Sequence, residues 1–359
     1  MIFGVRVFRH DVRNAHPIKS DLVEIAEQWQ KRERKMEENW KDQYDQLLCE
    51  NSLQASFAAS DLKNNHLPKK LYRYRPVTHD NVELRIDEIE NGTIYLAHPK
   101  DLNDKFEGCS FLSSRNSSPY HRKEYFEREY RGKISDDLFD QIFNSSEWFS
   151  NVMDFSAHQD VPEAEVESLK QDLEKIFQNE VEHLNESIII RTRQNVRVAS
   201  FTTEADNSNM WDRYASGHKG ICLEYDIEHL ENEYFRNRLF PVFYKDSMPD
   251  MIGRMTRGEF STFRFFDFIA MHKTKEWSNE NEWRLICPAD IEIVNSNELS
   301  DKIWEQGRTI TFIRPTKVIL GIDIDHEFEE RIRCAAEIYR IPVEKVVIND
   351  YGMGFVSVE

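Results

Sequence analysis

Two glutamates and an arginine stand at alternate positions near residue 280: Glu280, Glu282 and Arg284. In a strand, alternate side chains share one face, so the three charges would point the same way. Charged side chains are rarely buried unpaired, and a neighbouring guanidinium keeps a carboxylate ionised. The pattern predicts the polar wall of a site, with the solvated face of an edge strand as the alternative. Trp277 and Trp283 add apolar area nearby, which favours the packed setting.

Three further residues are candidates for the same site. His218 lies between Gly217 and Lys219 before an apolar strand, where it serves as a general base or phosphate contact, or simply as a turn histidine. Tyr214 lies three residues after Trp211, and we expect Trp211 in the core and Tyr214 on the pocket wall. Lys273 either contacts a phosphate group or lies at the solvated end of a helix. The sequence contains no phosphate-binding loop, dinucleotide fingerprint or nucleophile elbow.

Composition restricts the class of protein. The 359 residues carry a formal net charge of −18, which argues against non-specific binding to nucleic acid or to anionic lipid. The five cysteines are scattered without a CxxC pair, so we expect reduced thiols and neither a zinc site nor a disulfide framework. No apolar run approaches the roughly 18 residues that span a bilayer. We therefore expect a soluble cytoplasmic protein with no metal and no membrane partner.

The first 66 residues differ from the rest. Residues 1–10 alternate like a short strand, and 20–50 predict an amphipathic helix that begins at Ser20. Its apolar stripe packs on its own chain, or it supports a homo-oligomer or a partner protein. Residues 51–68 are polar and are predicted to be a linker.

Residues 67–359 predict a domain that mixes strands with helices. Arg73 and Arg75 share one face of its first strand, and Gly92 suits the left-handed position after the first helix. The turn 101–108 is predicted to be hydrogen-bonded around a buried Phe106, with a cation loop as the alternative. We expect strands at 71–76, 93–97, 187–190, 196–203, 221–225, 240–244, 280–286, 317–322 and 343–348, helices at 81–90, 210–215, 257–275 and 327–339, and a helical insertion at about 118–188.

Several of these segments, in this order, resemble a bacterial family of domains of unknown function, DUF2971. The resemblance covers about 70–359 and leaves residues 1–66 outside. The family usually has a proline where this chain has Lys105, and often Ser-His where Asp212-Arg213 stand. The segments that carry it are Leu71–Arg75, Gly92–Leu96 with Pro99, Asn103–Glu107, Phe201, Met210–Ala215, His218–Leu223, Lys273 with Trp277, Glu280–Leu285 and Ile319–Gly321.

The order of an arginine strand, a short helix, a glycine-bounded strand and a late Glu-x-Glu strand also resembles the ADP-ribosyltransferase fold. That resemblance implies an α+β fold with a mixed, mostly antiparallel, split sheet, and NAD as the cofactor consumed. A guanidinium binds a pyrophosphate through paired hydrogen bonds, and a carboxylate stabilises positive charge that develops on an anomeric carbon. Arg73 or Arg75 would then take the phosphates, Glu282 would be catalytic and Glu280 would activate the acceptor. The remaining site residues in this interpretation are His218 as a catalytic group and Tyr95, Tyr214, Lys273 and Arg284 as cofactor contacts.

The function expected from this resemblance is transfer of ADP-ribose from NAD to a protein or nucleic-acid acceptor, or hydrolysis of NAD, by a bacterial toxin or phage-defence effector. A non-catalytic module that binds a nucleotide or a partner in such a system is the alternative. A third alternative is a metal-dependent nuclease in which Asp101, Asp104 and Glu107 hold magnesium.

Overall fold

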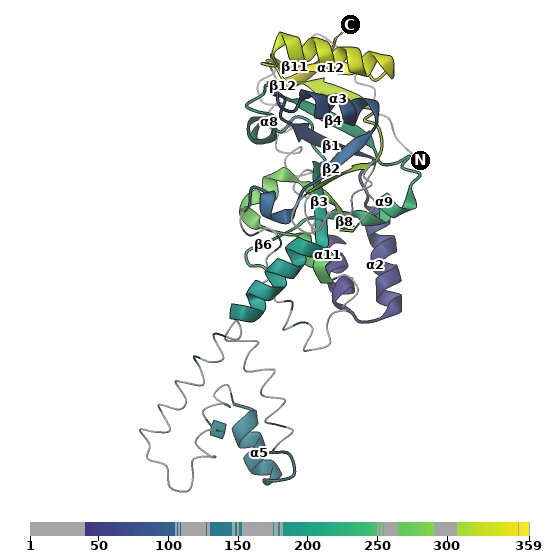
Figure 1. Ribbon diagram of the computed structural model, residues 1–359. Coiled ribbons are helices and arrows are strands. Elements are labelled where there is room, and N and C mark those ends of the chain that lie inside the picture. Colours follow the sequence, from purple (N-terminus) through teal and green to yellow (C-terminus); the bar gives the residue numbers. More distant parts are fainter. Residues whose placement is uncertain are drawn as a thin grey trace, which may run out of the picture. The chain divides into compact units, whose positions relative to one another are not determined.

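The computed structural model describes residues 40–104, 130–145, 182–249, 265–290, 307–350 and 352–358, with a few positions between these ranges (Figure 1). The chain forms two compact units, residues 1–46 and 47–359. The strand predicted at 1–10 and most of the helix predicted at 20–50 lie outside the described residues, while 40–49 is helical. No helix in the described part of the chain is long and apolar enough to cross a membrane.

The second unit is built on an eight-stranded sheet with the order β12-β11-β10-β4-β1-β3-β8-β5. All neighbouring strands are antiparallel except β10 and β11, which flank a helix and run parallel. The predicted α+β class with a mixed, mostly antiparallel sheet is thus confirmed. The strands are β1 (Lys70–Arg75), β3 (Val196–Thr202), β4 (Ile221–Asp226), β5 (Leu239–Pro241), β8 (Glu282–Pro288), β10 (Lys317–Leu320), β11 (Val343–Asn349) and β12 (Gly352–Ser357).

Two small sheets and several helices complete the unit. β2 (Thr93–Leu96) pairs with β9 (Arg308–Thr311), and β6 (Phe243–Lys245) runs parallel to β7 (His272–Thr274). Helices α3 and α12 lie side by side near β11 (Figure 1). The helices are α2 (Leu53–Asn65), α3 (Val82–Glu90), α5 (Asp136–Phe143), α8 (Ser208–Tyr214), α9 (Glu233–Arg238), α11 (Phe265–Ala270) and α12 (His326–Ile338), with 3-10 helices η1 (Pro99–Asp101) and η3 (Lys275–Glu280).

The central strands β3, β4 and β8 are buried along almost their whole length, so both faces of the sheet are covered there. Trp211 on α8 is fully buried and meets the ring of Tyr74 edge to face, with the centroids 5.1 Å apart. Asn207 caps α8 by accepting hydrogen bonds from the amides of its first turn, which fixes where that helix begins. Gly92 has φ of +63°, as predicted for the residue after α3.

The linker predicted at 51–68 is wrong, because this segment contains α2. The Ser52 side chain accepts a hydrogen bond from the Ala55 amide, and Ala55 and Ala59 give the helix a small buried face. Lys63 is 1% exposed, and its ammonium donates to three backbone carbonyls at the end of α9 and the start of β5. The segment looks like a linker in the sequence because the long side chain that it buries belongs to a lysine. That lysine can be buried because carbonyl oxygens accept its hydrogen bonds.

Other boundaries also differ from expectation. The strand predicted at 187–190 lies within a helix over 182–195, and the strand predicted at 240–244 is divided between β5 and β6. In the described part of 257–275, α11 gives way to β7. The reason is local: a ring nitrogen of His272 lies 2.7 Å from the Phe268 carbonyl oxygen and closes the helix. Of the predicted helical insertion, the structure describes α5 and the helix over 182–195, and most of the rest lies outside the described residues.

Candidate functional site

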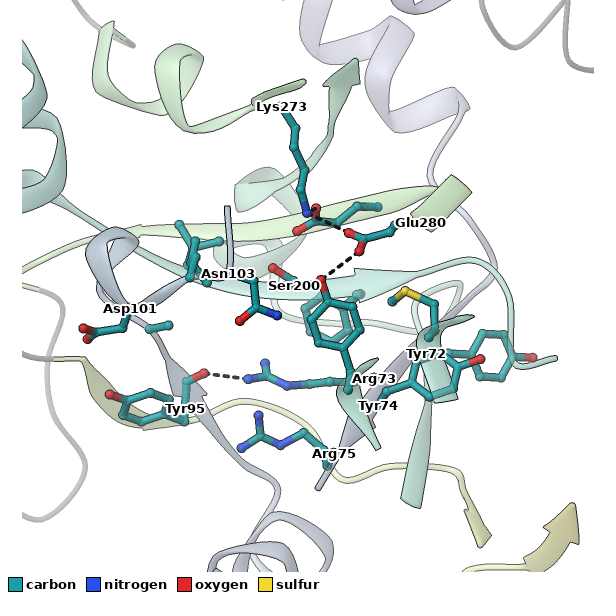
Figure 2. Close-up of a pocket in the computed structure, with 17 residues that line it drawn as sticks. Tyr72, Arg73, Tyr74, Arg75, Tyr95, Asp101, Asn103, Ser200, Lys273 and Glu280 are labelled. Atoms are coloured by element: carbon teal, nitrogen blue, oxygen red, sulfur yellow. Dashed lines mark hydrogen bonds and ion pairs between the residues drawn. The ribbon is translucent and has the colours of Figure 1, made fainter. Parts of the chain in front are cut away.

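A cavity of about 250 Å³ opens where the large sheet parts between β1 and β3 (Figure 2). These two strands pair at one position, Tyr72 with Thr202, whereas β3 and β8 pair along seven positions. Because β1 diverges from β3, side chains from both of its faces reach the cavity. The lining residues are Tyr72, Arg73, Tyr74, Arg75, Tyr95, Ala97, Asp101, Leu102, Asn103, Val198, Ser200, Phe201, Met210, Tyr214, Lys273, Glu280 and Glu282.

Arg73 and Arg75 form one end of this cavity and extend side by side toward Tyr95 (Figure 2). Arg73 is 6% exposed, and its Nη2 donates to the Tyr95 carbonyl oxygen at 2.8 Å. Its Nη1 is buried and has no hydrogen-bond partner among the described residues. Burial, together with the like charge of Arg75, lowers the pKa of Arg73 to about 10, so the guanidinium is still charged at neutral pH. A buried charged donor without an acceptor is costly, and an anionic ligand would satisfy it.

The turn after η1 borders the same end. Asp101 and Asn103 line the cavity, and the Asp104 carboxylate accepts a hydrogen bond from the Phe106 amide at 2.9 Å. This is the hydrogen-bonded turn that was predicted, but Phe106 is 47% exposed rather than buried. Glu107 lies outside the described residues.

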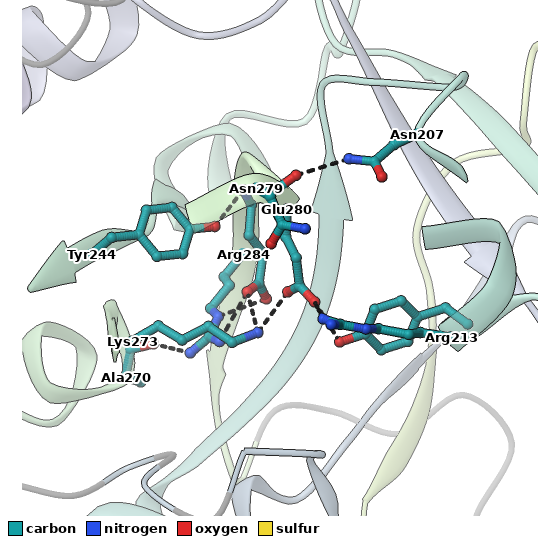
Figure 3. Close-up of polar contacts among 10 residues, drawn as sticks. Asn207, Arg213, Tyr244, Ala270, Lys273, Asn279, Glu280 and Arg284 are labelled. Carbon is teal, nitrogen blue, oxygen red and sulfur yellow. Dashed lines mark hydrogen bonds and ion pairs between the residues drawn. The ribbon is translucent and has the colours of Figure 1, made fainter. Parts of the chain in front are cut away.

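Glu280 and Glu282 form the opposite end, although not as neighbours on one strand face. Glu280 is the last residue of η3, Asn281 is left-handed with φ of 44°, and β8 begins at Glu282. The expected strand over 280–286 is therefore too long at its start. The left-handed turn nevertheless brings both carboxylates to one ammonium: Lys273 Nζ lies 2.7 Å from Glu280 Oε2 and 3.1 Å from Glu282 Oε2 (Figure 3). Lys273 reaches them from β7, so it is not at a solvated helix end.

Glu282 is held on both oxygens. Arg284 donates from Nε to Oε1 at 2.8 Å and from Nη2 to Oε2 at 3.1 Å, and Lys273 adds its ammonium. Burial acts to raise the pKa of Glu282, but the charges of Arg284 and Lys273 outweigh it and lower the pKa to about 2. Arg284 itself is 1% exposed and does not line the cavity. Its position supports the carboxylate from behind instead of contacting a ligand.

Glu280 has more capacity to accept. Its Oε1 accepts the Tyr214 hydroxyl at 2.7 Å, and Arg213 lies 3.8 Å away with 45% of its side chain exposed. Each carboxylate oxygen can accept more than one hydrogen bond, so Glu280 retains lone pairs for a ligand. Burial raises the pKa of Tyr214, which remains a hydrogen-bond donor at neutral pH. As predicted, Tyr214 lines the cavity while Trp211 lies in the core.

His218, like Arg284, is a predicted site residue that does not line the cavity. It has φ of 64°, its ring stacks on Trp211 with centroids 6.2 Å apart, and its carbonyl accepts the Asp323 amide. The turn-histidine alternative describes this position. Sequence reasoning missed Glu88, which pairs with Arg75 behind the cavity. The spacing of Arg85 and Glu88 within one helical turn was the available signal.

Comparisons with known proteins agree with one expectation. No curated protein and no solved structure matches the chain. Residues 210–285 match the family model described as "Protein of unknown function (DUF2971)". The matched segment begins on α8 and ends within β8, so it includes Tyr214, Lys273, Glu280 and Glu282 of the cavity wall. The match confirms the predicted resemblance to the DUF2971 family over residues 210–285.

Proposed function

We propose that this protein binds NAD in the cavity between β1 and β3 and cleaves its bond to nicotinamide, passing ADP-ribose to an acceptor or to water. The observation that carries the proposal is the placement of two arginines and two glutamates at opposite ends of one cavity, with Arg73 Nη1 lacking a partner among the described residues. A volume of about 250 Å³ is small beside the roughly 300–1,000 Å³ of sites that enclose whole ligands of drug size. Part of the dinucleotide would therefore lie outside.

In the proposed reaction the C1′–N1 bond breaks, and its electron pair leaves with the nicotinamide nitrogen. The acceptor atom bonds to C1′, and its proton passes to the Glu280 carboxylate. We assign this role to Glu280 because it accepts two hydrogen bonds from described residues, one from Tyr214 and one from Lys273, whereas Glu282 accepts at least three, two from Arg284 and one from Lys273. Glu282 then fixes Lys273 and, through it, Glu280. This differs from the resemblance, which implies that Glu282 is the catalytic residue.

Release of nicotinamide from NAD by the purified chain tests the proposal. We expect several turnovers in the wild type and a rate at least about 100-fold lower in Glu280→Gln, since a positioned general base contributes about 10²–10⁴-fold. Glu276→Gln is the matched control, because it removes an exposed acid from the same 3-10 helix. No release by the wild type, or release that survives Glu280→Gln, would refute the proposal.

A binding module without catalysis is the second candidate. It is favoured by the pairing at the acid end, where both carboxylates already share Lys273. In this case NAD would bind with a measurable heat and be recovered intact. Calorimetry combined with chromatography of the recovered ligand separates the two candidates.

The setting we propose is the bacterial cytoplasm, in a toxin or phage-defence effector that acts on a protein or nucleic acid. Cys222 and Cys287 are buried thiols, as suits a reducing compartment. Expression of the wild type should then arrest growth, and Glu280→Gln should relieve the arrest. Asp104→Asn should leave the growth arrest in place. Relief of the arrest by Asp104→Asn would instead favour a nuclease that uses the acids of the 101–107 turn. The helix predicted at 20–50 remains our candidate for self-association or a partner protein.

A further inference from the structure

Three guanidinium groups gather around one buried carboxylate behind the arginine end of the cavity. Glu88 on α3 is 3% exposed and lies among Arg73, Arg75 and Arg85. Arg85 donates from Nη1 to both Glu88 oxygens, at 3.1 and 2.9 Å. Arg75 meets the same carboxylate through Nε at 3.3 Å and Nη2 at 3.1 Å. One negative charge thus faces three positive charges.

The way these groups are paired decides which guanidinium nitrogens remain without a partner in the described part of the protein. Glu88 occupies Nε and Nη2 of Arg75, and the Tyr95 carbonyl occupies Nη2 of Arg73. Nη1 of Arg73 remains buried without a partner among the described residues. Because the two arginines stand two residues apart on β1, their Cα atoms are about 7 Å apart, and their side chains lie parallel (Figure 2). Guanidinium groups pair well with phosphate oxygens, so two parallel ones can each contact one phosphoryl group of the same ligand.

We propose that Glu88 is the positioning residue of a diphosphate subsite, in which Arg73 and Arg75 each bind one phosphoryl group. This deepens the proposed function and rests on it for the identity of the ligand. Glu88 clamps Arg75 against α3, so the guanidinium keeps its orientation when the cavity is empty. The ligand class is a diphosphate ester, which supplies the negative charge that Glu88 alone leaves unbalanced.

A positioning role and a purely electrostatic role of Glu88 predict opposite changes in the affinity for an anion when Glu88 is replaced by glutamine. Glu88→Gln removes a negative charge beside an anion site, which by Coulomb's law alone would strengthen anion binding. It also replaces one of the two acceptor oxygens by an amide nitrogen, which cannot accept from Arg75 or Arg85, so the two-point contact that holds Arg75 is broken at one point. If Glu88 acts by positioning, affinity for a diphosphate falls despite the gain in positive charge.

Calorimetric titration with inorganic pyrophosphate measures this sign. We expect Glu88→Gln to weaken binding at least tenfold, and Glu83→Gln to change it less than twofold, because Glu83 is an exposed acid on the same helix with 76% of its side chain accessible. Arg73→Lys, which keeps the charge and loses the Nη1 donor, should also weaken binding at least tenfold. It serves as the second variant should Glu88→Gln fail to fold. Equal or tighter binding of pyrophosphate by a folded Glu88→Gln, or by Arg73→Lys, overturns the proposal.

A kinetic readout separates positioning from a general structural role. With NAD, Glu88→Gln should raise KM at least tenfold and leave kcat within about twofold, whereas partial unfolding would lower kcat and leave KM unchanged. The two proposals fail in different ways. A wild type that binds pyrophosphate through Arg73 and Glu88 but releases no nicotinamide refutes the enzyme and keeps the diphosphate subsite. Cleavage of NAD combined with unaltered pyrophosphate binding in Glu88→Gln does the reverse.

Discussion

Replacing Lys273 by methionine should destabilise the fold strongly, because it leaves two buried carboxylates without their shared cation. Lys273 is 5% exposed, and Glu280 and Glu282 are each 2% exposed. Removing one partner of a buried ion pair costs about 3–5 kcal/mol. The charge of Lys273, after that of Arg284, also helps to lower the pKa of Glu282 against the effect of burial. We therefore expect a loss of about 3 kcal/mol at pH 7.

Urea unfolding followed by tryptophan fluorescence measures this loss, with Lys275→Met as the matched control. Lys275 is 66% exposed and lies 3.7 Å from Asp246, so its removal should cost less than about 1 kcal/mol. Losing the cation raises the pKa of Glu282 in the Lys273 variant, so the stability deficit of this variant should shrink as the pH falls from 7 to 5 and the carboxylate takes up a proton. Equal losses in the two variants, or a small deficit that does not change with pH, would refute the account of this cluster.

Three further predictions concern stability. Lys63→Met removes three hydrogen bonds to backbone carbonyls and should cost about 3 kcal/mol, measured by thermal unfolding; a loss under about 1 kcal/mol would mean that water replaces the ammonium. Gly220→Ala places a Cβ on the carbonyl oxygen of Arg75 and should cost at least about 2 kcal/mol or prevent soluble expression, and a variant of wild-type stability would contradict the close approach. The lowered pKa of Glu282 stabilises the fold above the unfolded-state pKa, and this contribution is lost as the pH falls toward 2. The stability difference between wild type and Glu282→Gln in urea should therefore narrow from pH 6 to pH 3, and a constant difference would argue against the shift.

The sequence was sufficient to predict the elements whose apolar residues follow the period of a strand or a helix. β4 is a nearly continuous apolar run because both faces of the sheet are covered at this strand. α12 has apolar residues at helical spacing along one side, and β11 follows it in the chain. The convergence of Arg73 with Glu282 was also predicted, and both line one cavity. Alternation placed the arginines on one face of β1, and the strand order then brought β1, β3 and β8 together.

Features set by distant contacts were not predictable in this way. Nothing in the polar run of α2 indicates that Lys63 ends under the carbonyls of α9, more than 170 residues away. The end of α11 depends on His272 and Phe268, and the aromatic run before it continues a helical pattern past the true boundary. Glu88 was not singled out from the sequence, because its partner Arg75 lies on another element. In each case the missing information is a tertiary partner for a polar group.

The two ends of the cavity differ in how their charges are balanced, and this difference constrains the ligand. At the acid end each carboxylate has a cation within hydrogen-bonding distance, so the protein has already offset the cost of burying them. At the arginine end one carboxylate serves three guanidinium groups, and Arg73 keeps a buried donor unmet among the described residues. A buried unmet cation is stabilised by an incoming anion, so the negative part of a ligand belongs beside Arg73. In the proposed complex with NAD, the diphosphate would lie beside Arg73, and the ribose would place the cationic nicotinamide ring toward Glu280; a simple nucleoside diphosphate has no such cationic ring.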